Sequence, residues 1–152
     1  MELKLDEKDL EILSMLSENA KLSSKQIAKK TSIPLTTVHN RIKKMEENKV
    51  IEKYGIKINF KKLGRGIPAL IFITFSLSQK SGTNINLESL AKQILEIPNC
   101  EELMFLTSEY DAILRVNVAD IEELSGLVTK KLRSMFGIDK TITAIILNHF
   151  QK

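Results

Sequence analysis

Residues 22–49 place the strongest constraint on the fold, because they predict two short helices joined by a tight turn. Ser23 followed by Gln26 is the pattern of a capping box, in which each side chain accepts a hydrogen bond from the other residue's backbone N–H. Pro34 suits the first turn of the next helix, where its missing N–H would have no partner. We expect that second helix to run from about Pro34 to Asn48. Two helices so arranged form a helix-turn-helix, which is typical of proteins that bind double-stranded DNA.

The second helix has two chemically different sides. Helical spacing of 100° per residue predicts a buried stripe of Leu35, Val38, Ile42 and Met45. The other side is polar at the start and cationic further along, which suits base edges first and phosphates after. The candidates for base contacts are Thr36, Thr37, His39 and Asn40, and those for phosphate contacts are Lys25, Arg41, Lys43 and Lys44. Any amphipathic surface helix also has a polar side, so this pattern alone leaves that alternative open.

A helix that precedes this pair is expected to complete a three-helix core. Asp6 is placed to cap it with Asp9 three residues on, and Leu5 and Leu10 are spaced as a hydrophobic staple. Its expected inward residues are Leu10, Leu13 and Leu16. Two short helices cannot bury enough apolar surface alone, so a helix-turn-helix needs this third wall.

Charge is distributed unevenly along the 152 residues. Residues 1–66 contain 15 Lys and Arg against 9 Asp and Glu, whereas residues 67–152 contain 8 against 10. The N-terminal part is therefore cationic, and the C-terminal part is slightly acidic. A cationic module attracts the phosphate backbone and gives binding that weakens with salt.

The remaining composition limits the function classes. No apolar run is long enough to span a membrane, and the first residues do not resemble a signal peptide, so we expect a cytoplasmic protein without membrane contact. The single cysteine, Cys100, has no neighbouring metal-ligand pattern and is expected to pack in a core. We find no catalytic constellation and expect no metal or cofactor.

The C-terminal part alternates strands and helices after a linker. Short strands are expected at residues 50–54 and 56–59, and residues 61–66 carry two glycines and several cations, as a hinge would. Further on we expect strands at 67–77, 100–107, 111–118 and 139–148, and helices at 87–96 and from a capping box at Asp120 and Glu123 to Gly137. This order is that of a ferredoxin-like sheet with both helices on one face.

The predicted fold class is thus α+β, with a three-helix, winged-type helix-turn-helix domain at 1–50, a short β linker at 51–66 and a ferredoxin-like βαββαβ domain at 67–152. Several strands are apolar on both sides, among them 70–75 and 144–147. Since the helices can cover only one face, we expect a second subunit to cover the other, which predicts a homodimer.

These segments together resemble the Lrp/AsnC (feast/famine) family of transcription regulators over nearly the whole chain. The resemblance rests on residues 5–13, on Ile27-Ala28, Val38, Arg41-Ile42 and Val50-Ile51, and on residues 100–111 within the βαββαβ order. It implies a transcription regulator that dimerises through its C-terminal sheets and often assembles further, commonly into an octamer. Pro34 stands where many members carry a capping Ser.

The resemblance also implies that a small molecule, usually an amino acid, binds between subunits. The family's effector loop has a Gly-Asp-Tyr-Asp type pattern, and here the corresponding residues are Ser108, Glu109, Tyr110 and Asp111, with Ser in place of Gly. The acidic side chains could pair with an ammonium group, while the Thr107 and Ser108 hydroxyls could bind a carboxylate. A hairpin whose polar residues only satisfy the turn is the alternative.

Two other function classes remain as alternatives. Enzymes of the same build include decarboxylases of the sirohaem branch, whose site needs several His and Arg; this chain has only His39 and His149, with Arg115 and Arg133 in its C-terminal part. A protein-interaction module is the other alternative, and the basic, Thr- and Asn-containing second helix argues against it.

Overall fold

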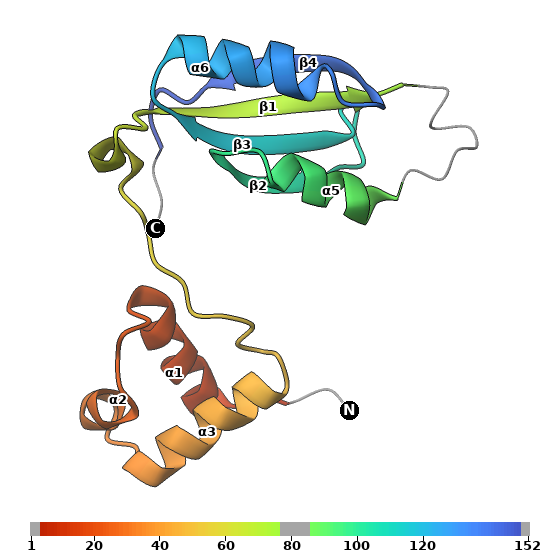
Figure 1. The fold of residues 1–152 in the computed structure, drawn as a ribbon. Coiled ribbons are helices and arrows are strands. Elements are labelled where there is room, and N and C mark those ends of the chain that lie inside the picture. Colours follow the sequence, from red (N-terminus) through yellow and green to blue (C-terminus); the bar gives the residue numbers. More distant parts are fainter. Residues whose placement is uncertain (1–3, 77–85, 150–152) are drawn as a thin grey trace. The chain divides into compact units, whose positions relative to one another are not determined.

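The computed structural model describes residues 4–76 and 86–149, and the chain divides into two compact units, Met1–Ile58 and Asn59–Lys152 (Figure 1). Each unit has its own hydrophobic core. The predicted linker, 51–66, is shared between the two units. Its hinge contains Gly64 at φ +75°, a left-handed conformation that favours glycine.

The N-terminal unit consists of α1 (Glu7–Glu18), α2 (Ser24–Thr31) and α3 (Leu35–Glu47). Both predicted capping boxes are present, between Asp6 and Asp9 and between Ser23 and Gln26. Ser32 ends α2 with φ +57°, and Pro34 precedes the first turn of α3 without a side-chain cap. The helix-turn-helix therefore forms where the sequence predicts it.

Six residues from the three helices and the turn form the N-terminal core, namely Ile12, Leu16, Ile27, Ile33, Val38 and Met45. Two expectations were wrong, because Leu10 is 56% exposed and Leu35 is 47% exposed. On α1 the inward stripe runs through Ile12 and Leu16, and Leu10 lies about 160° away from Ile12 at 100° per residue. Leu35 follows the predicted stripe of α3, but it lies in the first turn, at the edge of the core.

The linker differs from expectation. The strands predicted at 50–54 and 56–59 are absent, and residues 52–59 have no regular secondary structure. A strand needs a neighbour that accepts and donates its backbone hydrogen bonds, and the described part of this single chain pairs none with this segment. The short helix η1 (Phe60–Leu63) follows.

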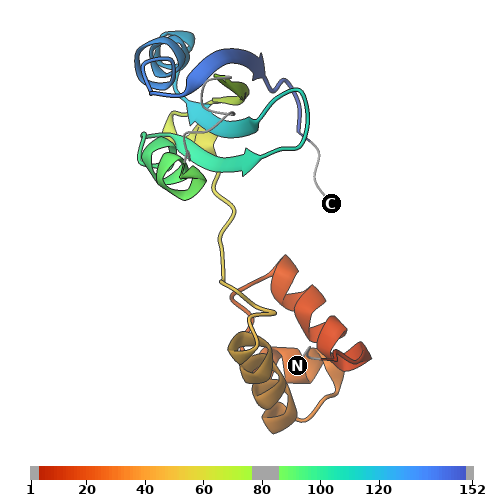
Figure 2. The same ribbon diagram turned by 90° about the vertical axis from the view of Figure 1, so that its right-hand side faces the viewer.

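The C-terminal unit has the predicted βαββαβ order. Its elements are β1 (Ile67–Phe75), α5 (Leu87–Leu95), β2 (Cys100–Phe105), β3 (Ala112–Val118), α6 (Ile121–Gly126) continued by the π-helical turn η2 (Leu127–Leu132), and β4 (Ile138–Ile145). The antiparallel sheet has the order β2-β3-β1-β4. Figure 2 shows both helices on the same face of the sheet.

The helix-covered face of the sheet carries the second core. Ala69, Ile71, Ile73 and Phe75 of β1 alternate as buried residues and pack with α5, α6 and η2. Cys100 packs at the edge of this core, and burial raises the pKa of its thiol to about 11, as suits a packing residue. At α6, Asp120 caps the Glu123 N–H as predicted, but the Glu123 carboxylate accepts from Ala119 instead of Asp120, so the reciprocal box was wrong.

Candidate nucleic-acid interface and effector loop

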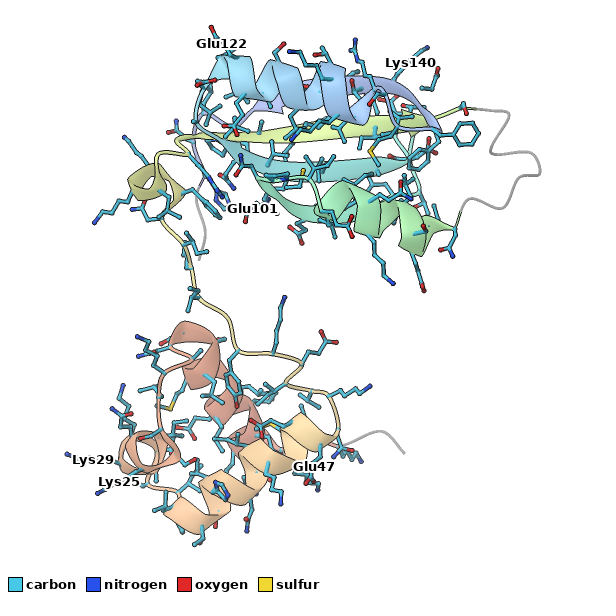
Figure 3. All side chains as sticks on the ribbon, in the orientation of Figure 1. Lys25, Lys29, Glu47, Glu101, Glu122 and Lys140 are labelled. Atoms are coloured by element: carbon cyan, nitrogen blue, oxygen red, sulfur yellow. The ribbon has the colours of Figure 1, made fainter. Side chains whose placement is uncertain are left out.

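The outer side of α3 is the candidate nucleic-acid interface. Val38 and Met45 are buried and hold the helix against α1 and α2, which turns the opposite side outward. Thr36, His39, Asn40, Lys43 and Lys44 are exposed, and Thr37 is half-buried. Lys25 extends from α2 into solvent beside Lys29 (Figure 3). Of the eight predicted contact residues, six are therefore exposed to solvent and Thr37 is partly exposed.

Lys43 forms an exposed ion pair with Glu47 of the same helix. Its Nζ lies 3.8 Å from Oε1 of Glu47, and both side chains are about two-thirds exposed. An exposed pair of this kind contributes little to stability. The ammonium group can therefore exchange this partner for a phosphate at small cost.

Arg41 is the exception among the predicted contacts. Its Nη1 donates to Oδ1 of Asp6 at 2.8 Å and to Oδ1 of Asp9 at 2.7 Å, and only 26% of its side chain is exposed. These hydrogen bonds raise the pKa of Arg41 further above its usual value, with the bond to Asp9 contributing most. The sequence predicted a phosphate contact for Arg41. In the structure its side chain links α3 to the start of α1 through these ion pairs.

The C-terminal end of α3 is tied to the segment that follows it. The Tyr54 hydroxyl donates to Oε1 of Glu46 at 2.7 Å. Desolvation of the hydroxyl, together with this hydrogen bond and the charge of Glu46, raises the pKa of Tyr54 to about 12. Sequence reasoning missed this contact, since nothing in the pattern of residues 50–59 links them to α3.

The predicted effector loop joins β2 to β3. Ser108 Oγ donates to the Tyr110 carbonyl at 2.9 Å and accepts from the Tyr110 N–H at 3.2 Å, and Asp111 Oδ2 accepts from the Phe75 N–H at 2.7 Å. Ser108 thus bonds the backbone of its own turn, as a satisfied turn requires, whereas Asp111 bonds the backbone of β1. Thr107 and Glu109 are exposed, and a hydrogen bond to Glu109 raises the pKa of Tyr110.

A hollow of about 390 Å³ lies between Tyr110 of this loop and the edge strand β4, and its lining includes Phe72 and Ile142. Phe72 and Tyr110 form part of its wall, and the centroids of their rings are 5.1 Å apart. Lys140 of β4 and Arg133 line it as well, and Arg133 Nε donates to Thr141 at 3.0 Å. Both cations were missed, because they lie far from the loop in sequence and only the fold brings them to Tyr110.

The open sheet face is apolar in one complete row. The strand register places Met104, Ile113, Phe72 and Ile142 side by side across β2, β3, β1 and β4. The adjacent row contains Glu102, Arg115, Leu70 and Ala144. Within it, Nε of Arg115 lies 3.9 Å from Oε2 of Glu102. Ile142 is 52% exposed and Met104 is 36% exposed, as expected for an uncovered face.

Two kinds of site are not found in the described part of the chain. No group of three or more His, Cys, Asp or Glu side chains is placed to hold a metal ion there. Nor is any helix within residues 4–76 and 86–149 both long and apolar enough to cross a bilayer.

Comparison with family models defines the class of the protein. A winged helix-turn-helix DNA-binding model matches residues 5–52, and a model of the Lrp/AsnC ligand binding domain matches residues 70–152. Together they define a DNA-binding transcription regulator with a ligand-binding domain. The chain belongs to the Lrp/AsnC family.

Similar proteins carry regulator names. The chain is 36% identical over 141 residues to an uncharacterized HTH-type transcriptional regulator of Pyrococcus furiosus, covering 93% of this chain and 91% of that protein. It is 33% identical over 146 residues to the HTH-type transcriptional regulator LrpA of Pyrococcus horikoshii, covering 94% and 96%. These names indicate regulators and not enzymes, so the decarboxylase alternative is wrong.

Solved structures share the fold over nearly the whole chain. A Neisseria meningitidis transcriptional regulator, solved as its L-Met complex, has a TM-score of 0.88 at 21% identity and covers 98% of this chain and 94% of its own. Escherichia coli AsnC has a TM-score of 0.81 at 23% identity and covers 97% and 95%. The predicted α+β fold is confirmed.

Proposed function

We propose that this regulator reads specific duplex DNA by placing α3 in the major groove, with two subunits presenting α3 to successive grooves of a partly palindromic site. Thr36, Thr37, His39 and Asn40 are the proposed base or near-base contacts, and Lys25, Lys43 and Lys44 the proposed phosphate contacts. The main observation that supports this proposal is that the buried Val38 and Met45 turn the polar side of α3 outward. A protein that binds chromosomal DNA must act where the chromosome lies, and in a prokaryotic cell this is the cytoplasm.

Alanine substitutions of Asn40 and Lys43 are expected to change DNA affinity in different ways. An Asn amide can bond adenine in two places, so Asn40→Ala should lose roughly tenfold affinity for duplex selected from a random pool and little for random duplex. Lys43→Ala should weaken both equally and reduce the salt slope by about 1, because it removes one phosphate contact. Gel shifts over a salt series measure both quantities.

Lys130→Ala is the matched control for Lys43→Ala, because it removes an exposed Lys from η2 in the other unit. It should leave both affinities unchanged. Equal losses on selected and random duplex for Asn40→Ala would refute its role in base reading.

Dimerisation through the open sheet face is the second part of the proposal. The row of Met104, Ile113, Phe72 and Ile142 spans all four strands and exposes side chains that are apolar throughout. Packing this row against its counterpart in a second copy would remove it from water and would hold two α3 helices together in one particle.

We further infer that the effector is an amino acid, bound beside the loop of residues 107–111. The match to the Lrp/AsnC ligand binding domain supports a ligand here, and the related Neisseria regulator was solved with L-Met. In the loop, the exposed Glu109 carboxylate can accept from an ammonium group. Across the hollow, Lys140 and Arg133 can pair with a carboxylate, and the Phe72 ring can pack against an apolar side chain.

Calorimetry tests the effector assignment. Titration of the twenty common amino acids is expected to give heat with at least one of them, and Glu109→Gln should weaken that binding roughly tenfold, since a charge-assisted hydrogen bond is lost. Glu101→Gln is the control, because Glu101 is exposed on β2 and outside the loop (Figure 3). Absence of heat across the set would count against an amino-acid effector.

A further inference from the structure

We propose that Arg41 is a positioning residue that masks two carboxylates beside the DNA-facing side of α3, and that it does not itself contact DNA. Its Nη1 bonds both Asp6 and Asp9 within 2.8 Å. Its Nε is buried and has no hydrogen-bond partner among the described residues. The Nη1 donor of Arg41 is therefore bonded to the two carboxylates at the start of α1, and its Nε is shielded from solvent.

The two carboxylates lie where a phosphate would approach. Asp6 and Asp9 line one hollow of the N-terminal unit together with Thr37, Asn40 and Lys44, which are proposed DNA contacts. The Asp9 side chain is only 12% exposed, and that of Asp6 is 55% exposed. Two carboxylates at this place would repel the phosphate backbone, and the low solvent exposure of Asp9 would strengthen its share of that repulsion.

The same two carboxylates also cap the N-terminus of α1. Asp6 Oδ1 accepts from the Asp9 N–H and Asp9 Oδ2 accepts from the Asp6 N–H, each at 3.0 Å, which starts α1. The backbone hydrogen bond from Asp9 and the bonds from Arg41 lower the pKa of Asp6, so this carboxylate keeps its charge to lower pH than an ordinary aspartate does. Arg41 thus allows an acidic helix cap next to a DNA-binding surface, and its bonds also fix α3 against the start of α1.

A double-mutant cycle separates masking from direct contact. Asp6→Asn and Asp9→Asn remove the charges but keep an oxygen that can accept the capping hydrogen bonds. Arg41→Ala is expected to weaken binding to random duplex roughly tenfold in the otherwise native chain, and less than about threefold in the chain that carries both Asn substitutions, because no carboxylate is then left unmasked. The salt slope should stay unchanged, since no phosphate contact is removed.

Three outcomes would overturn the masking role: an equal loss in both backgrounds, a slope reduced by about 1, or no loss in either background. Circular dichroism shows whether Arg41→Ala folds. If it does not, the chain that carries both Asn substitutions and keeps Arg41 still tests the proposal. It should bind random duplex at least about threefold more tightly than the native chain, and unchanged or weaker binding would contradict the proposal.

This inference rests on α3 being the DNA-facing helix. Lys43→Ala in the same assay distinguishes the two failures. If Lys43→Ala has no effect, the proposed interface is wrong; if it weakens binding but the Asn substitutions do not rescue Arg41→Ala, only the masking role is wrong.

Discussion

Replacing Ile142 with aspartate is expected to turn dimers into monomers at micromolar concentration and to lower affinity for selected DNA by about 100-fold or more. In a single chain Ile142 is 52% exposed on the strand β4, so an aspartate there stays hydrated and the C-terminal unit folds. In a dimer formed through the open sheet face the new carboxylate would be buried without a partner, at a cost of several kcal/mol. Sedimentation and gel shifts measure the two effects.

Thr143→Asp is the matched control for Ile142→Asp. Thr143 is the next residue of β4, is exposed, and pairs with Ile71, whose side chain lies on the helix-covered face. The control adds the same charge to the same strand but leaves the apolar row intact, so it should remain dimeric. A monomeric native protein, or a dimeric Ile142→Asp variant, would refute dimerisation through this face.

Replacing Val38 with aspartate is expected to unfold the N-terminal unit while the C-terminal unit stays folded. Val38 is 0% exposed and lies in a core of its own, separate from that of the sheet. A buried unpaired carboxylate costs several kcal/mol, which is comparable to the whole stability of a domain of this size. Specific DNA binding should fall by about 100-fold or more, because an unfolded unit presents no recognition helix.

Circular dichroism, limited proteolysis and sedimentation together test this expectation. Helix content should fall, a protease-resistant C-terminal fragment should accumulate, and the variant should still dimerise. Val38→Ala is the graded control and should destabilise the unit by only about 1–2 kcal/mol. Loss of both units in one transition would contradict their independence.

Local rules were sufficient to predict most of the elements of this fold. The caps at Asp6, Ser23 and Asp120 are interactions between residues three apart, so the sequence displays both partners. Alternation in β1 and helical spacing in α3 likewise follow from the geometry of one element. The βαββαβ order then follows from the succession of elements.

The failures depend on what another element does. Leu10 looks equivalent to Leu13 and Leu16 until the direction of approach of α2 and α3 selects one stripe of α1. The strands expected at 50–59 have the composition of strands but no partner strand in the described chain. Arg41 looks like any cation on a recognition helix, and its partners lie 32 and 35 residues away.

The site predictions divide in the same way. The polar side of α3 could be predicted because burial of Val38 and Met45 determines which side faces outward. In the effector loop the residue types were informative, but the backbone partners of Ser108 and Asp111 depend on the turn and on β1. Lys140 and Arg133 reach the hollow only through the packing of β4 and η2.

The two separate cores carry an evolutionary consequence. Substitutions that retune base preference on α3 alter neither the side chains that pack beneath the sheet nor those that line its hollow. A lineage can therefore change which genes it controls while keeping the same sensor, or acquire a new signal while keeping the same operators. A hybrid that joins the N-terminal unit of one relative to the C-terminal unit of another should bind the DNA sites of the first and respond to the ligand of the second.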